Sequence, residues 1–162
     1  MNLKRYPATL IIRHKRENLK KCSLRGLEKK EEFTFYTYPI DTLPALDGGD
    51  GGYLLLKVGA PPLTPQDIGR GLLLVDATWR LAQKIEKQLP TSLESRSLPS
   101  HFRTAYPRRQ THCPDPETGL ASIEALFLSF YLMGRPTKGL LDQYHWKESF
   151  LLLNKLSVTD IG

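Results

Sequence analysis

The sequence of 162 residues contains little cysteine, and it has no long hydrophobic run. Its two cysteines, Cys22 and Cys113, are too few for a disulfide framework or for a zinc site built from cysteine alone. No apolar stretch reaches the about 18 residues that a membrane-spanning helix needs. The first seven residues also lack the apolar segment and cleavage site of a secretory signal. We therefore expect a cytoplasmic protein that has no membrane partner.

Sequence motifs of several enzyme classes are missing as well. There is no G-x-S-x-G nucleophile elbow, no P-loop and no G-x-G-x-x-G dinucleotide fingerprint. The glycine-rich run at 48–52 lacks the lysine and the following helix of a phosphate loop, so we interpret it as a flexible turn. The spacing of the four histidines does not match a metal site, and we expect no bound metal.

Positive charge is present in excess, and all of the excess lies in the first fifth of the chain. Residues 1–32 hold ten Lys or Arg and four Glu, which gives a net charge of +6, whereas residues 33–162 hold thirteen of each sign. A concentrated basic segment favours phosphate backbones or anionic membranes. A solvated, lysine-rich surface helix would have the same composition, so charge alone leaves both interpretations open.

With 40% apolar and 25% charged residues, the chain has enough apolar material for one domain with a single core. Short apolar runs alternate with segments of helical periodicity, which predicts an α/β fold with a mostly parallel sheet flanked by helices. The expected strands are 9–12, 33–38, 53–58 and 71–75. The expected helices are 18–30, 80–88, 119–133 and 137–153, and the segment 64–67 is expected to be an N-cap with Pro65 at the first helical position. Residues 90–118 carry five prolines and are predicted to be irregular.

Two side chains follow the apolar strand 71–75 at the sheet edge where α/β proteins bind ligands. Asp76 could act as a general base or polar anchor, and it could equally cap the helix that follows. Trp79 could present its indole N–H to a ligand carboxylate, or it could be a core residue. In the irregular stretch, Arg103, Arg108 and Arg109 surround Tyr106, a combination that suits single-stranded RNA as well as an ordinary surface loop.

Five motifs in one order resemble the ribosomal-RNA aminocarboxypropyltransferases. Lys20-Lys21-Cys22-Ser23 is similar to their Lys-Lys-Cys-Thr, and Asp76-Ala77-Thr78-Trp79 to their Asp-x-x-Trp after an apolar strand. The third motif is the Arg-x-Leu-Pro at 96–99, which is followed by Ala-Tyr-Pro where the family has Ala-Asn-Pro. The fourth is the Leu-Ala-Ser-Ile-Glu-Ala helix start at 120–125, and the fifth is the chain ending at 144–154. The related DTW-domain transfer-RNA enzymes share part of this pattern but begin with a cysteine-rich cluster that is absent here.

The resemblance implies a SPOUT-like fold, in which one domain spans 1–162 and its C-terminal part threads a trefoil knot. Residues 1–60 would be the basic part that faces RNA, and 61–162 the knotted part that binds the cofactor. The implied cofactor is S-adenosylmethionine (SAM). The implied reaction moves its 3-amino-3-carboxypropyl group to N3 of a uridine or pseudouridine in ribosomal RNA or transfer RNA.

The resemblance also implies roles for individual residues. Trp79 would anchor the cofactor carboxylate, and Asp76 would act on the uridine as general base or orienting group. The implied cofactor-binding residues are Ser23, Leu56, Val75, Trp79, Leu98, Ala121 and Ser122. The RNA-binding residues that we expect are Lys20, Lys21, Arg25, Arg103, Arg108 and Arg109.

Two other functions remain open from the sequence. A SPOUT-like RNA methyltransferase would use the same cofactor and release S-adenosylhomocysteine in place of methylthioadenosine. A non-catalytic RNA-binding or ribosome-assembly factor would release neither product. We expect the chain to be a monomer whose partner is RNA.

Overall fold

The computed structural model describes residues 6–14, 23–40, 42–48, 51–107 and 119–158, apart from the side chain of Trp79. Five strands form one parallel sheet in the order β2-β1-β4-β3-β5. They are β1 (Thr9–His14), β2 (Phe33–Tyr38), β3 (Tyr53–Leu56), β4 (Gly71–Asp76) and β5 (Glu94–Arg96). The predicted α/β class with a parallel, helix-flanked sheet is confirmed.

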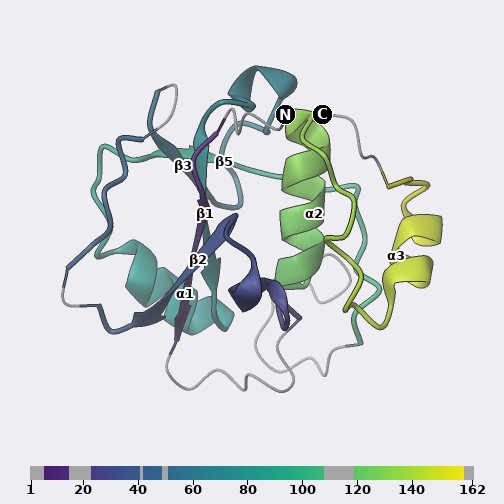
Figure 1. Cartoon of the computed structure of the whole chain (residues 1–162). Coiled ribbons are helices and arrows are strands. Elements are labelled where there is room, and N and C mark those ends of the chain that lie inside the picture. The colour runs from purple at the N-terminus through teal and green to yellow at the C-terminus, as the bar shows by residue number, and fades with distance from the viewer. Residues whose placement is uncertain (1–5, 15–22, 41, 49–50, 108–118, 159–162) are drawn as a thin grey trace.

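Helices cover both faces of this sheet, as Figure 1 shows. Side chains alternate along each strand, so that Leu72 and Leu74 of β4 face one layer and Leu73 faces the other. The first layer contains α2 (Ser122–Met133) and α3 (Lys147–Leu153), and the second contains α1 (Trp79–Glu86). Burial on both faces explains why β1 and β4 read as continuous apolar runs.

The α2 helix lies between the sheet and α3, and most of its residues are buried. It begins after Ala121 and ends at Gly134, whose φ of 78° suits a glycine C-cap. The sequence prediction placed its start at 119, three residues too early. This helix is the element that connects the C-terminal half of the chain to the carboxyl ends of the strands.

Two predicted helices are wrong over most of their length. Within the described part of 18–30, the chain forms turns and only a short 3-10 helix, η1 (Leu27–Lys29), which follows Gly26 at φ 97°. Within 137–153, only α3 is α-helical, because Gly139 at φ 85° interrupts the pattern and the chain turns until residue 146. The apolar residues in these turns are still buried, and this burial produced the misleading helical spacing.

The predicted irregular stretch 90–118 hides an edge strand. β5 pairs with β3 through the register Leu55↔Ser95. The predicted N-cap with Pro65 at the first helical position is confirmed: Thr64 caps the 3-10 helix η2 (Pro65–Asp67), and its hydroxyl accepts the backbone N–H of Gln66 at 3.3 Å.

A close approach joins the first residues of β3 and β4 and fixes their register. Tyr53 of β3 lies opposite Gly71 of β4, and its ring covers the glycine. A Cβ atom at position 71 would lie 2.5 Å from the ring. The Tyr53 hydroxyl then donates to the Ala8 carbonyl oxygen at 2.5 Å, which connects β3 to the segment before β1.

A buried arginine holds the same end of the sheet, where β1 and β4 begin. Arg135 is 1% exposed, and its guanidinium lies 3.7 Å from the ring centre of Tyr6 and 5.1 Å from that of Phe130. It donates to the backbone carbonyl oxygens of Ile68 and Arg70. Burial lowers the pKa of Arg135 to about 10, so the group still carries its charge at neutral pH.

Candidate functional site

The carboxyl end of β4 holds the carboxylate that the sequence singled out. Asp76 is 6% exposed, and its Oδ1 accepts a hydrogen bond from the Ser122 hydroxyl at 2.6 Å. Ser122 is the first residue of α2, so this contact joins positions 46 residues apart. Two residues predicted to belong to one site therefore touch in the folded chain.

The structure also bears on the alternative role of Asp76 as a helix cap. The residue at the N-cap of α1 is Thr78, and the helix begins at Trp79. Asp76 lies two residues earlier, within β4, and its side chain points to the face of the sheet that α2 covers. Asp76 is therefore not the N-cap residue of α1.

Ser23 is the third predicted residue at this place. Its hydroxyl accepts the backbone N–H of Ile123 at 3.1 Å. Adjacent residues at the start of α2 thus bind β4 on one side and the segment before η1 on the other. Ser23, Asp76 and Ser122 are brought together around a single helix N-terminus, although the sequence places them in three distant segments.

The start of α2 is held by a buried carboxylate to which its sequence motif assigned no role. Glu124 is fully buried, and each of its carboxylate oxygens accepts one hydroxyl and one backbone N–H. The donors to Oε1 are Thr104 Oγ1 at 2.6 Å and Ala121 N at 2.8 Å. The donors to Oε2 are Ala105 N at 2.8 Å and the Tyr144 hydroxyl at 2.9 Å. Glu124 therefore fixes Ala121 and the 104–105 loop relative to each other.

Three apolar residues expected to line a cofactor pocket differ in their placement. Leu56 ends β3, and its half-buried side chain packs with that of Leu98 against the same clusters. Val75 packs on the opposite face of the sheet, in the layer of α1. A contact of Val75 with a ligand on the α2 face is thus restricted to its backbone. The side chain of Trp79 lies outside the described part of the structure.

A buried arginine is the second feature that sequence reasoning missed. Arg13 of β1 is the register partner of Asp76, and it is 6% exposed. Its guanidinium lies 4.3 Å from the ring centre of Phe35 and 3.5 Å from the Glu28 carboxylate. A charged residue within an apolar strand was the available signal, because such a residue needs partners when it is buried.

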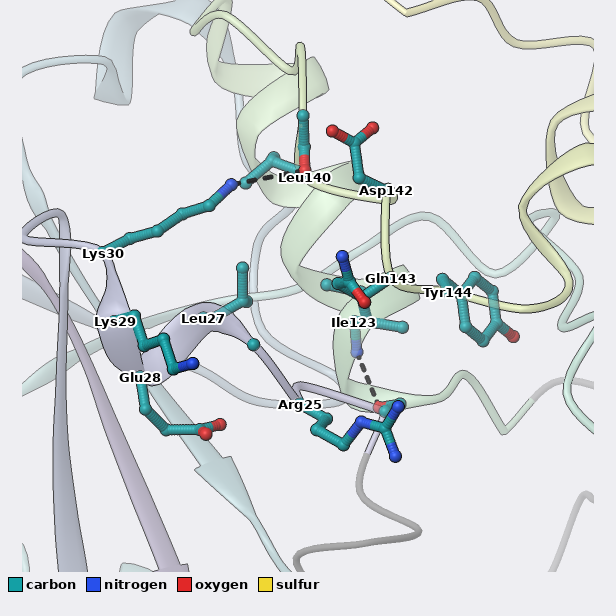
Figure 2. Close-up of a pocket in the computed structure, with 13 residues that line it drawn as sticks. Arg25, Leu27, Glu28, Lys29, Lys30, Ile123, Leu140, Asp142, Gln143 and Tyr144 are labelled. Atoms are coloured by element: carbon teal, nitrogen blue, oxygen red, sulfur yellow. Dashed lines mark hydrogen bonds between the residues drawn. The ribbon is translucent and has the colours of Figure 1, made fainter.

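A cavity of about 420 Å³ opens beside this site, between η1 and the turns after α2. Figure 2 shows its walls, with Leu27, Lys29 and Lys30 on one side and Leu140, Asp142 and Gln143 on the other. Ser23 and Ile123, the pair at the start of α2, also line it. The cavity and the Asp76–Ser122 pair therefore lie on adjacent sides of the same helix terminus.

Two of the six predicted RNA-binding residues can be placed. Arg25 is exposed and lines the cavity. Arg103 is exposed and directly precedes Thr104 and Ala105, which bind Glu124. The Arg103 backbone is held by Asn154, which accepts its N–H and donates to its carbonyl oxygen, each at 2.8 Å. The other four, Lys20, Lys21, Arg108 and Arg109, lie outside the described residues.

The described part of the chain contains no cluster of three or more His, Cys, Asp or Glu that could hold a metal ion. No helix within it is long and apolar enough to cross a membrane.

Comparison with known proteins rests on one similarity of structure, because no family model and no curated protein matches the chain. The chain is similar to Tsr3 from Vulcanisaeta distributa, described as a SAM-dependent ribosomal-RNA aminocarboxypropyltransferase. The TM-score is 0.68 and the sequences are 26% identical, over 92% of this chain and 79% of the other. This chain resembles an RNA-modifying enzyme. The similarity supports the family that the five motifs indicated, and it extends over almost all of the fold.

Proposed function

We propose that this protein is a SAM-dependent aminocarboxypropyltransferase that acts on ribosomal RNA, and that it modifies N3 of a uridine or pseudouridine. The similarity to Tsr3 over 92% of the chain is the observation that carries this proposal. The contact between Asp76 and Ser122 supports it, because it places a carboxylate at the carboxyl end of a parallel strand, where α/β folds bind their ligands.

Residues on the α2 face of the sheet fit the two chemical halves of SAM. Leu56 and Leu98 supply half-buried apolar surface that suits an adenine ring. Ser23 and Ser122 supply hydroxyl groups that suit an amino-acid moiety. The residues proposed to hold the cofactor are Ser23, Leu56, Val75, Trp79, Leu98, Ala121 and Ser122, with Val75 acting through its backbone.

The chemistry that we propose depends on orientation. When bound, SAM supplies a sulfonium whose three attached carbons are all electrophilic, and methylthioadenosine is the leaving group when the propyl carbon is attacked. The Trp79 indole N–H would hold the carboxylate of the transferred group and so turn that carbon toward the base. Asp76 would accept the N3 proton of the uridine or orient its ring. The hydrogen bond from Ser122 keeps the Asp76 carboxylate in one position, at 2.6 Å.

The RNA partner is proposed on charge as well as on the similarity. Residues 1–32 carry the whole net charge of +6, and Arg25 places part of it at the edge of the site. The proposed RNA-binding residues are Lys20, Lys21, Arg25, Arg103, Arg108 and Arg109. A SPOUT-like topology with a C-terminal trefoil knot, a monomeric state and a cytoplasmic location belong to the same proposal.

The identity of the by-product tests this function. The protein should be incubated with ribosomal RNA and SAM that carries a radioactive label either in the carboxypropyl group or in the methyl group. Label should enter RNA from the carboxypropyl group only, and methylthioadenosine should accumulate. Transfer of the methyl label with S-adenosylhomocysteine would establish a methyltransferase, and absence of both products would establish a non-catalytic factor.

Calorimetry provides a check that does not depend on the RNA. The isolated protein should bind SAM with a stoichiometry near one. A protein that shows no binding at cofactor concentrations well above the micromolar range would contradict the cofactor assignment. Mass mapping of ribosomal RNA and transfer RNA from a deletion strain would then identify the modified nucleotide.

A further inference from the structure

Three cationic side chains line the cavity beside the start of α2, and two of them were not among the residues expected to bind RNA. Arg25, Lys29 and Lys30 line it, and all three side chains are exposed. Lys30 extends across the cavity, and its Nζ donates to the Gly139 carbonyl oxygen at 3.3 Å (Figure 2). Two further donors of this ammonium group remain for a ligand.

The two acidic residues of the lining are each bound to a cation that lies outside it. Glu28 pairs with Arg13 at 3.5 Å, and Asp142 pairs with Lys147 at 3.6 Å. These pairs reduce the negative potential that the carboxylates would otherwise contribute. Within the described residues, Lys29 forms no ion pair with a carboxylate. The net field in the cavity therefore favours an anion.

The inner wall of the cavity belongs to the proposed catalytic site. Ile123 and Ser23, joined by the hydrogen bond in Figure 2, form this wall, and the residue before Ile123 is the Ser122 that binds Asp76. A second connection runs through Arg13, which lies opposite Asp76 in the sheet and pairs with Glu28 of the lining. A ligand in the cavity would thus have one end at Lys29 and Lys30 and the other beside Arg25 and the reacting group (Figure 2).

We infer that this cavity receives a nucleotide of the substrate RNA, with its phosphate at Lys29 and Lys30 and its base directed toward the Ser23–Ile123 wall, beside which Arg25 lies (Figure 2). The inference rests on the proposed function, which it extends by assigning a place to the RNA. The volume of about 420 Å³ lies in the range of small-ligand pockets. A nucleotide of single-stranded RNA supplies both the anion, in its phosphate, and the flat base that such a cavity can take.

The first test removes charge from the cavity. A Lys29→Gln/Lys30→Gln variant should be compared with Lys84→Gln/Lys87→Gln, which removes the same charge from exposed positions at the far face of the sheet. The probe is a fluorescein-labelled single-stranded oligouridylate, titrated without SAM at several salt concentrations. Loss of this one phosphate contact should reduce the magnitude of the slope of log K against log salt by about 0.7 in the cavity variant. The control variant should keep the wild-type slope.

The second test fills the cavity without changing its charge. Gln143 is an exposed residue of the lining, and its side chain lies over Gly26. Gln143→Trp should weaken oligouridylate binding by about tenfold, whereas Gln143→Ala should not weaken it. In the transfer assay, Gln143→Trp should lower kcat/KM for RNA and leave KM for SAM unchanged, a combination that a folding defect would not produce.

The outcomes separate this inference from the proposed function. If Gln143→Trp binds the probe as wild type does, the nucleotide does not enter the cavity, and the inference is overturned even when the charge variant binds weakly. If the cavity variants behave as expected but wild-type protein yields no methylthioadenosine from ribosomal RNA, the cavity binds RNA and the proposed reaction is wrong.

Discussion

Replacing Glu124 by glutamine should destabilise the protein and loosen the cofactor site together. Each oxygen of this buried carboxylate accepts one backbone N–H and one hydroxyl. In glutamine one of the two oxygens becomes an NH₂ group, which cannot accept a hydrogen bond. The Thr104 or Tyr144 hydroxyl can rotate and accept from this group, but a backbone N–H cannot. In either orientation of the amide, one of the N–H groups of Ala105 and Ala121 is therefore left unsatisfied.

The size of the effect follows from this count. A buried donor without a partner costs about 1–3 kcal/mol, and the remaining hydrogen bonds also lose the strength that a charged acceptor gives them. A total loss of about 2–3 kcal/mol in the free energy of unfolding corresponds to a melting temperature lower by about 4–12 °C for a chain of this size. The affinity for SAM should fall as well, because Ala121 and Ser122 lie in the turn that Glu124 holds.

Thermal melting and SAM calorimetry measure the two effects. Tyr144→Phe removes a single hydroxyl donor and leaves the Ala105 N–H in place, so it should cost only about 1 kcal/mol. Glu31→Gln, at an exposed position, should change stability by less than about 0.5 kcal/mol. If Glu124→Gln melts at the wild-type temperature, the carboxylate does not hold these four donors, and our account of the site scaffold is refuted.

Four further outcomes are expected. Trp79→Phe keeps most of the apolar surface and removes one donor to a charged group, so SAM affinity or transfer rate should drop about tenfold to a hundredfold in calorimetry or the transfer assay. Asp76→Asn should slow transfer and leave SAM affinity unchanged; a variant that only melts earlier would indicate a structural role. Arg135→Met should lower the free energy of unfolding by about 2–4 kcal/mol, measured by urea denaturation, without affecting SAM affinity, because it leaves buried carbonyl oxygens without donors far from the site. Replacement of Lys20, Lys21 and Arg25 by glutamine should flatten the salt dependence of RNA binding, measured as the slope of log K against log salt. An unchanged slope would show that this N-terminal segment is a solvated surface.

The sequence predicted best those elements whose local pattern agrees with their surroundings in the fold. The alternating aromatic and threonine residues of 33–38 form β2 within the predicted bounds. β5 was missed because its three residues, Glu94, Ser95 and Arg96, have no strand pattern, and only the pairing with β3 makes them a strand. The helix predicted over 137–153 failed because Gly139 turns the chain while its apolar neighbours still reach the core.

In the candidate site, too, the sequence predicted what a local pattern specifies and missed what depends on contacts in the folded chain. The position of Asp76 after an apolar strand was visible in the sequence, and its place at the sheet edge followed from the α/β class. Its contact with Ser122 depends on how α2 returns to the sheet, which no local pattern specifies. The four donors of Glu124 come from three separate segments, so its role could be found only in the folded chain.

The close contact between Tyr53 and Gly71 has a consequence for how this sequence can change. A side chain at position 71 would collide with the tyrosine ring, and loss of the ring would leave a void over the glycine and free the Ala8 carbonyl oxygen. Neither position can therefore vary alone without a cost in stability. In relatives that keep this strand register, we expect the two positions to covary, with an aromatic residue at one accompanied by glycine at the other.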